Sequence, residues 1–351
     1  MTMQYRQLGR TGLRVSTFTL GTMGFGGTGW ATPVGQIDVS GAREQIAIAR
    51  DAGVNLIDTA DVYSAGLSEE ILGEALGGDR DQVLIATKAR MPMGDGPNDA
   101  GLSRHHIVRA AEASLRRLNT DYIDLYQVHE WDGHTPLEET LTALDDLVRS
   151  GKVRYIGCSN YAAWQMMKAL AISDARHLER FASTQVYYSL QNRDIEAEIV
   201  PAVVDQGLGI LVWSPLAGGL LSGKYRRGVE APAGSRHLSE WSEPPINDED
   251  KLYDTIELAV KIGESHGVSA AQVALSYIAQ KPGVTSLIVG SRTPAQLRDN
   301  LAAADLELTA DEVKALDDVS GEPLRYPFWH QRNTSSDRLS AADLTQIQRH
   351  L

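Results

Sequence analysis

The chain has 351 residues, with 33 Lys and Arg against 46 Asp and Glu, so its formal net charge at pH 7 is −13. That balance argues against non-specific binding to nucleic acid, because such binding needs a basic surface. The 42% of hydrophobic residues is ordinary for a globular protein, and no apolar run reaches the roughly 18 residues of a membrane-spanning helix.

The N-terminal residues and the cysteine content bear on where in the cell the protein is expected. Residues 1–6 lack the apolar core of a signal peptide. A single cysteine, Cys158, precludes an intrachain disulfide and is typical of a reducing compartment. We therefore expect a cytoplasmic protein that binds neither membrane nor nucleic acid.

Strand patterns recur along nearly the whole chain. Residues 5–8 and 13–16 flank Gly9-Arg10-Thr11-Gly12, which predicts a hairpin that caps the bottom of a barrel. Eight short apolar runs follow, and we predict strands at 17–21, 55–58, 83–87, 122–128, 153–157, 183–187, 210–213 and 286–289.

The stretches between these strands have helical periods. Ser40 is predicted to cap a helix that runs to Arg50, and Ser103 to cap the helix after the third strand. Thr135-Pro136-Leu137-Glu138 is a predicted capping box with proline at the first helical position. Eight strand–helix units in a row predict a parallel α/β sheet, and eight is the number that closes a (β/α)8 TIM barrel. An open doubly wound sheet is the alternative architecture.

Two segments fall outside this repeat. Residues 224–250 contain several prolines and glycines and are predicted to form a long loop at the C-terminal end of the seventh strand. The tail, residues 321–351, shows no regular period, and we expect it to fold back over the barrel mouth. The whole chain, 1–351, is predicted to be a single domain.

Four polar side chains lie at the C-terminal ends of three predicted strands. Asp58 ends one apolar run and Tyr63 follows five residues later, Lys88 ends a second run, and His129 ends a third. In a parallel barrel this is the end at which chemistry takes place. Each residue alone is more often structural than catalytic, but four complementary groups on one face favour a reaction centre.

These four groups suit the reduction of a carbonyl group, which takes a hydride to carbon and a proton to oxygen. Tyr63 is the predicted proton donor, and a neighbouring Lys88 would lower the phenol pKa by stabilising the phenolate. Asp58 is predicted to pair with Lys88 and hold it in place. His129 is predicted to donate a hydrogen bond to the substrate oxygen.

The sequence from Asp58 to Tyr63, followed by residues 67–76, resembles the signature of the aldo-keto reductase family. The Lys88 strand and residues 126–129, 157–160 and 213–216 match that family in order and spacing, and the resemblance covers about residues 8–316. It implies a TIM barrel that reduces an aldehyde or ketone with NAD(P)H, with Asp58, Tyr63, Lys88 and His129 as the catalytic tetrad.

Two segments are candidates for binding the cofactor phosphates. Residues 24–29 fit G-x-G-x-x-G, but that motif needs a helix to start there, and residues 30–33 follow with no helical period, so we interpret them as a glycine loop at the mouth. The better candidate is Gly290–Gln296, where Thr293 is a predicted N-cap, Pro294 the first helical residue and Gln296 the end of a capping box. Free amides at such a helix start, with Arg292 beside them, favour an anion.

The resemblance to aldo-keto reductases supports this phosphate site and adds Asn300 near the adenine. Arg292 next to Ser291 suits the 2′-phosphate of NADP, although many members have Lys where this chain has Gly290 and Arg where it has Gln296. We therefore expect NADPH, with NADH possible. The resemblance implies further cofactor contacts from the residues that match the family pattern: Gly21, Thr22, Met23, Asp58, Ser159, Asn160, Gln185, Trp213, Ser214, Leu216 and Gly218.

Aromatic residues on the predicted mouth loops are candidates for lining the substrate pocket, namely Phe25, Trp30, Trp131 and Trp241. Such walls favour a hydrophobic or ring-bearing small-molecule carbonyl compound, or the apolar face of a sugar. Adjacent His105 and His106 do not share a helix face, and no metal is predicted. Cys158 is expected to be a small buried residue rather than a nucleophile.

Two alternatives to the reductase stay open. The first is a cofactor-binding regulatory subunit on the same fold, like the relatives that dock on potassium channels. The second is a sugar or polyol dehydrogenase that uses the same residues in the oxidative direction. The sequence does not fix the oligomeric state.

Overall fold

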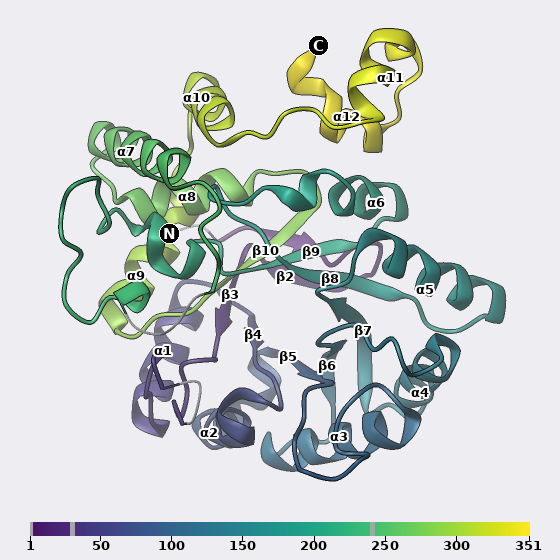
Figure 1. Cartoon of the computed structure of the whole chain (residues 1–351). Coiled ribbons are helices and arrows are strands. Elements are labelled where there is room, and N and C mark those ends of the chain that lie inside the picture. Colours follow the sequence, from purple (N-terminus) through teal and green to yellow (C-terminus); the bar gives the residue numbers. More distant parts are fainter. Residues whose placement is uncertain (1–2, 29–31, 239–242) are drawn as a thin grey trace.

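The computed structural model describes residues 3–28, 32–238 and 243–351. Its centre is a closed parallel barrel in which β10 hydrogen-bonds to both β3 and β9, so the open sheet is excluded (Figure 1). The barrel strands are β3 (Phe18–Gly21), β4 (Leu56–Asp58), β5 (Leu84–Ala89), β6 (Ile123–Val128), β7 (Val153–Ser159), β8 (Phe181–Tyr187), β9 (Gly209–Trp213) and β10 (Val284–Val289).

The predicted strands are confirmed, but two of them are longer than predicted at the C-terminal end. β5 continues through Lys88 to Ala89, and β7 continues through Cys158 to Ser159. The polar side chains in these extensions, Lys88 and Ser159, are buried inside the barrel and are 0% and 1% exposed. The sequence prediction ends these two strands before Lys88 and Ser159, because hydrophobic patterning gives no signal for a polar residue that is buried inside a barrel.

Helices surround the barrel (Figure 1), and no described helix is long and apolar enough to cross a membrane. The α-helices are α1 (Val39–Asp51), α2 (Leu67–Leu76), α3 (Arg104–Arg117), α4 (Leu137–Arg149), α5 (Ala163–Arg176), α6 (Ile199–Gln206), α7 (Glu249–His266), α8 (Ala270–Ala279), α9 (Pro294–Ala302), α10 (Ala310–Ser320), α11 (Phe328–Thr334) and α12 (Ala341–Ile347).

Three predicted helix starts have different outcomes. Ser103 caps α3 as predicted, since its side chain accepts a hydrogen bond from the backbone N–H of His106. Ser40 is not a cap, because Asp38 accepts from the N–H of Gly41 and starts α1 earlier. The predicted capping box at α4 is wrong. The Thr135 hydroxyl donates instead to Asp132, and the N-cap is the following proline.

The N-terminal hairpin, β1 (Tyr5–Gln7) and β2 (Arg14–Ser16), closes the bottom of the barrel as predicted. Leu8 and Val15 are fully buried in a cluster with apolar side chains of the barrel strands. Gly9 adopts a φ of +59°, and a Cβ there would lie 2.4 Å from the carbonyl oxygen of Ala182 at the start of β8. This close approach requires glycine, and it leaves the opposite end of the barrel for the site.

The segment between the η5 turn (Ala217–Ser222) and α7 is the long loop that the sequence predicts, with one described short turn, η6 (Arg236–Leu238). Two side chains tie it to the barrel mouth. Arg292 Nη1 donates to the carbonyl oxygen of Gly234 at 3.0 Å, and Gln191 Nε2 donates to that of Pro245 at 2.8 Å. The loop therefore runs between the start of α9 and the connection after β8.

The tail contains α11 and α12, contrary to the prediction of an irregular segment. These helices lie beyond α6, on the outer side of the barrel, and α12 packs against α6 (Figure 1). In the part of the chain that the structure describes, the tail therefore covers an outer helix, and the prediction that it folds over the mouth is wrong.

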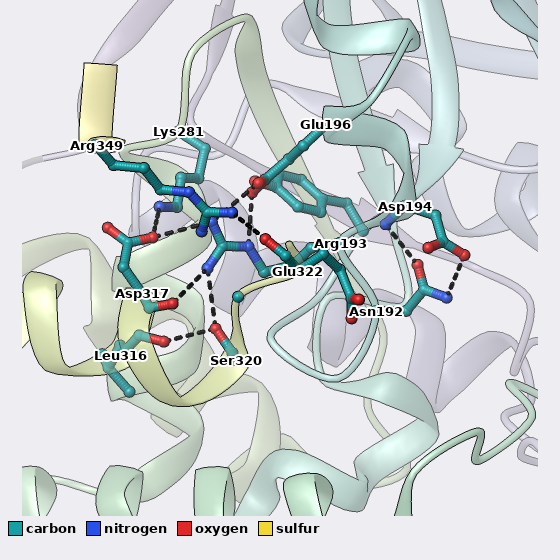
Figure 2. A network of polar contacts seen from close by, with 12 residues as sticks. Asn192, Arg193, Asp194, Glu196, Lys281, Leu316, Asp317, Ser320, Glu322 and Arg349 are labelled. Atoms are coloured by element: carbon teal, nitrogen blue, oxygen red, sulfur yellow. Dashed lines mark hydrogen bonds and ion pairs between the residues drawn. The ribbon is translucent and has the colours of Figure 1, made fainter. Parts of the chain in front are cut away.

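A buried arginine lies where the tail meets the barrel (Figure 2). Arg193 is 4% exposed and forms ion pairs with Glu196 at 2.8 Å and Asp317 at 3.0 Å, and it donates to Ser320 Oγ at 3.1 Å. Asp317 also pairs with Lys281 at 2.7 Å. This Arg193 network joins the β8–α6 connection to the end of α10.

Replacing Arg193 tests how much this network stabilises the fold. We expect Arg193→Met to lower the free energy of unfolding by about 3 kcal/mol, because the largely buried Glu196 carboxylate loses its cation and Asp317 loses one of its two. The matched control is Arg325→Met, since Arg325 pairs with Asp194 at 3.5 Å and both side chains are mostly exposed, so its loss should stay below about 1 kcal/mol. Urea unfolding measures both, and equal losses would contradict the prediction.

Candidate active site

The turn after β4 places Tyr63 above the barrel end. Asp58 is the last residue of β4, and the η2 turn begins at Tyr63. Ser64 and Ala65 then adopt left-handed backbone conformations, with φ of 50° and 56°. Gly66 has a φ of +97° and packs against the Arg117 side chain, which a Cβ would approach to 2.9 Å. This tight turn leads straight into α2 and fixes Tyr63 close to its strand.

The Lys88 ammonium is the centre of the site. It donates to Asp58 Oδ1 at 2.6 Å, to the carbonyl oxygen of Thr59 at 2.7 Å and to the Tyr63 hydroxyl at 3.4 Å. Lys88 is 0% exposed, and these three acceptors match the three protons of an ammonium group. Burial alone would lower the pKa of Lys88, but Asp58 and Tyr63 outweigh it and raise that pKa, so the lysine is charged.

Asp58 joins the site to two further strands through its second oxygen. Oδ2 accepts from Gln185 Nε2 at 2.8 Å and from Gln127 Nε2 at 3.5 Å. The sequence does not single out Gln127, which lies in β6 two residues before His129, the residue that follows this strand. Gln185 was predicted as a cofactor contact, and here its amide supports Asp58.

Tyr63 and His129 are neighbours, with ring centroids 5.9 Å apart in an edge-to-face arrangement. Burial raises the pKa of Tyr63, and Lys88 opposes this only in part. The predicted lowering effect of Lys88 is therefore present, but desolvation exceeds the attraction of one ammonium, so the Tyr63 pKa lies above its usual value. Burial, with smaller effects from Lys88 and Arg90, lowers the pKa of His129 to about 3, so its ring is neutral and carries one N–H.

Residues at the ends of β7 and β9 form the next part of the mouth. Trp213 Nε1 donates to Asn160 Oδ1 at 3.0 Å, and the Asn160 amide donates to Glu130 Oε1 at 2.9 Å. The Trp213 ring lies against Tyr187 at a centroid distance of 5.0 Å. Ser159 Oγ is buried and has no hydrogen-bond partner within the described residues. Of these predicted cofactor contacts, the Asn160 side chain therefore hydrogen-bonds to other protein groups, whereas the Ser159 hydroxyl does not among the described residues.

Three predicted contacts lie at the end of β3. Gly21 ends the strand, and a Cβ there would lie 2.9 Å from Ile288 Cγ2. The Thr22 hydroxyl is fully buried, with the carbonyl oxygen of Asp58 at 3.1 Å and Ser68 Oγ at 3.0 Å. Thr22 therefore holds β3, β4 and α2 together, while Met23 is half-buried beside it.

The segment after β9 turns sharply. Ser214 has a φ of +51° and Gly218 a φ of +64°, and Ser214 Oγ accepts from the N–H of Gly218 at 3.0 Å. Leu216 lies between them and precedes η5. These three predicted contacts therefore lie on one tight turn at the C-terminal end of the barrel.

The start of α9 confirms part of the predicted cap. Thr293 is the N-cap and accepts from the N–H of Gln296 at 3.3 Å, with Pro294 at the first helical position. The Gln296 side chain accepts from the N–H of Arg292 at 3.1 Å rather than from that of Thr293, so the second half of the capping box is wrong. Ser291 Oγ is buried without a hydrogen-bond partner among the described residues.

The other predicted residues of this region differ in exposure. Gly290 is exposed at the end of β10, whereas Asn300 is 7% exposed on α9. Gln45 of α1 donates to the carbonyl oxygen of Ser291 at 3.2 Å, a support that the sequence reasoning missed. No motif marks Gln45, so only the fold brings it to this place.

The aromatic residues predicted to line the substrate pocket differ in burial and in their contacts. Phe25 is 0% exposed and packs with Ala42 and Ile71, so it belongs to the core, and its prediction as a pocket wall is wrong. Trp131 is half-buried and contacts the rings of Tyr161 and Trp164 at 5.2 and 5.6 Å. Trp30 and Trp241 lie outside the described residues.

Neither metal nor thiol chemistry has a basis in the described residues. No three His, Cys, Asp or Glu side chains among them are arranged to hold a metal ion. Cys158 lies inside β7, and burial raises the pKa of its thiol to about 12, which disfavours the reactive thiolate.

Comparisons with known proteins bear on this site. The model of the aldo/keto reductase family matches residues 17–320. An uncharacterized oxidoreductase, YrpG, from Bacillus subtilis (strain 168) is 41% identical over 332 residues, 92% of this chain and 97% of that protein. Probable voltage-gated potassium channel beta subunits from Arabidopsis thaliana and Oryza sativa subsp. japonica are 37% and 39% identical, each over 87% of this chain and 92% of their own length. The chain belongs to the aldo/keto reductase family.

Proposed function

We propose that this protein is an NADPH-dependent reductase of an aldehyde or ketone, acting reversibly. The observation that supports this most is the contact of the buried Lys88 ammonium with both Asp58 and the Tyr63 hydroxyl, beside the ring of His129. A buried cation beside a phenol stabilises the phenolate that is left when the phenol donates its proton to a carbonyl oxygen. The family and the relative named an oxidoreductase support the broader class.

Members of the family use nicotinamide cofactors, and the residues present fit one. Ser159 Oγ and Ser291 Oγ are buried without protein partners among the described residues, which leaves them for a polar ligand. The start of α9 lies directly after Ser291 and Arg292, and the N-terminus of a helix favours an anion such as a phosphate. We infer that Ser159 and Trp213 hold the nicotinamide end and that residues 290–292 hold the adenosine phosphate. The bound cofactor supplies the hydride.

The remaining steps belong to the chain's own residues. The Tyr63 hydroxyl donates its proton to the substrate oxygen, and Lys88 stabilises the phenolate that is left. Asp58 pairs with Lys88, so that the ammonium stays in place while buried. The single N–H of neutral His129 donates a hydrogen bond to the carbonyl oxygen and orients it.

Replacing Arg292 tests the preference for NADPH. Arg292 is exposed at the start of α9 and is the proposed partner of the 2′-phosphate. We expect Arg292→Ala to raise KM for NADPH about tenfold, as for the loss of a charged hydrogen bond, and KM for NADH by less than about twofold. Arg298→Ala, on the exposed face of the same helix, is the matched control and should change neither value. An equal rise for both cofactors would remove Arg292 from this role.

The names of two relatives support a second candidate, a cofactor-binding regulatory subunit. The experiment that separates the candidates follows the loss of NADPH absorbance with a reactive aromatic aldehyde, beside NADH, and adds a binding titration. Turnover supports the reductase, whereas tight NADPH binding without turnover of any carbonyl tested favours the regulator. Oxidation of sugars or polyols would use the same residues in reverse, and the same assay with NADP⁺ measures it.

A further inference from the structure

Asp61 is a buried carboxyl that the proposed reaction does not use. It lies between Asp58 and Tyr63 and is 0% exposed. Neither of its carboxyl oxygens has a hydrogen-bond partner within the described residues. Its backbone N–H donates to the carbonyl oxygen of Lys88 at 3.1 Å, which fixes the residue beside the end of β5. A carboxylate in such a place is disfavoured, because burial removes its hydration and no side chain among the described residues donates a hydrogen bond to it.

The charged and titratable groups around Asp61 come from α2, α3, β5, β6 and the η2 turn. They are Glu69, Arg117, Lys88, Tyr126 and Tyr63. Both nearby cations have other partners. Arg117 Nε donates to Glu69 Oε2 at 2.7 Å, and Glu69 also accepts from the Thr87 hydroxyl at 2.5 Å.

The Lys88 ammonium directs its three donors to Asp58, Thr59 and Tyr63, as described above. Asp61 therefore receives no hydrogen bond from either cation. Burial, reinforced by Glu69 and opposed by Arg117, by the nearby backbone N–H of Val62 and by Lys88, raises the pKa of Asp61 to about 8. At neutral pH the carboxyl is mostly protonated.

We propose that Asp61 is a positioning residue that sets the charge around Tyr63 and Lys88. While the Asp61 carboxyl is neutral, Asp58 supplies the negative charge that pairs with Lys88. When Asp61 ionises, it adds a second negative charge that opposes formation of the Tyr63 phenolate. This inference rests on the proposed function in so far as Tyr63 is the proton donor. The bond between Asp58 and Lys88 is kept in both states, so Asp61 acts on the phenol through charge alone.

The consequence is a second titration in the site. When Asp61 loses its proton, a negative charge two residues from Tyr63 makes the phenol harder to ionise. Reduction requires negative charge to develop on that oxygen in the transition state, so kcat/KM for reduction falls as the pH rises through about 8. Removal of the Asp61 charge removes this inflection from the pH profile.

The first test needs neither substrate nor cofactor. Infrared difference spectra of wild type against Asp61→Asn should contain a protonated-carboxyl C=O band at pH 7 that disappears at higher pH. Ultraviolet titration, taken as the difference from Tyr63→Phe, should place the Tyr63 ionisation about one pH unit lower in Asp61→Asn than in wild type. Asp121→Asn, at an exposed carboxyl, is the matched control and should leave both signals as in wild type.

A second variant, Asp61→Leu, is needed in case the asparagine amide of Asp61→Asn perturbs folding. Asp61→Leu has no charge and no amide, so the same lowering of the Tyr63 ionisation in both variants assigns the effect to charge. A wild-type spectrum without the carboxyl band, or a Tyr63 ionisation that neither variant moves, overturns the proposal. If no carbonyl compound is reduced, the proposed function fails, and the two spectroscopic results still decide the role of Asp61.

Discussion

Tyr63→Phe is expected to lower kcat for carbonyl reduction about a thousandfold, the range typical of a lost general acid. The change removes the hydroxyl that accepts from Lys88 and leaves the ring, which lies edge-on to His129. The dissociation constant for NADPH should change by less than about twofold, because none of the residues assigned to the cofactor is altered. Absorbance assays measure the rate and fluorescence titration measures the binding.

Tyr161→Phe is the matched control for this substitution. The Tyr161 hydroxyl is also buried, but it has no hydrogen-bond partner among the described residues, and its ring contacts Trp131 at the same end of the barrel. Its loss should leave kcat close to that of wild type. Retention of wild-type kcat by Tyr63→Phe would show that the proton comes from another group.

Lys88→Met is expected to cause the largest loss of stability, about 3–5 kcal/mol in the free energy of unfolding. It deletes the ammonium that pairs with Asp58 at 2.6 Å, and the Asp58 side chain is only 3% exposed, so a buried carboxylate loses its cation. The double variant Asp58→Asn/Lys88→Met should recover most of this loss, because an amide carries no charge to desolvate. Urea unfolding with a common m-value gives the comparison.

The exposed pair Lys314–Asp318 provides the control for Lys88→Met. Its side chains are 72% and 66% exposed and its atoms are 2.6 Å apart, so Lys314→Met tests an ion pair of similar length in water. We expect its loss to stay below about 0.5 kcal/mol. If Lys88→Met cost no more than this, burial of the pair would not explain the expected loss of stability.

The barrel and the positions of its strands follow from sequence patterns, because alternating strand and helix signals recur eight times. The predicted strand ends and helix caps that differ from the structure do so for local reasons. Lys88 and Ser159 are polar residues inside strands, and they are tolerated because the closed barrel buries them at a polar site rather than in its apolar layer. Asp38 lies two residues before Ser40 and accepts a hydrogen bond from the first turn of α1, so it is the N-cap in place of Ser40.

Two further failures concern long-range packing. Phe25 follows a strand and is flanked by glycines, which suggested an exposed loop, but α1 and α2 cover it completely. The tail has no strong apolar period, yet α12 packs against α6 and Ile347 is fully buried there. Gln127 and Gln185 reach Asp58 only because the barrel closes, which no local pattern reports.

The hydrogen bonds of Asp58 have a consequence for how such sites are inherited. One carboxylate on β4 receives donors from β5, β6 and β8, so it fastens four strands of the barrel across its interior. A descendant that lost its reaction would still need Asp58 and Lys88 to keep that interior together. Their presence in a relative therefore reports ancestry and barrel integrity, whereas selection on Tyr63 and His129 would relax once turnover ceased. Those two positions are the ones to inspect when deciding whether a related chain is an enzyme.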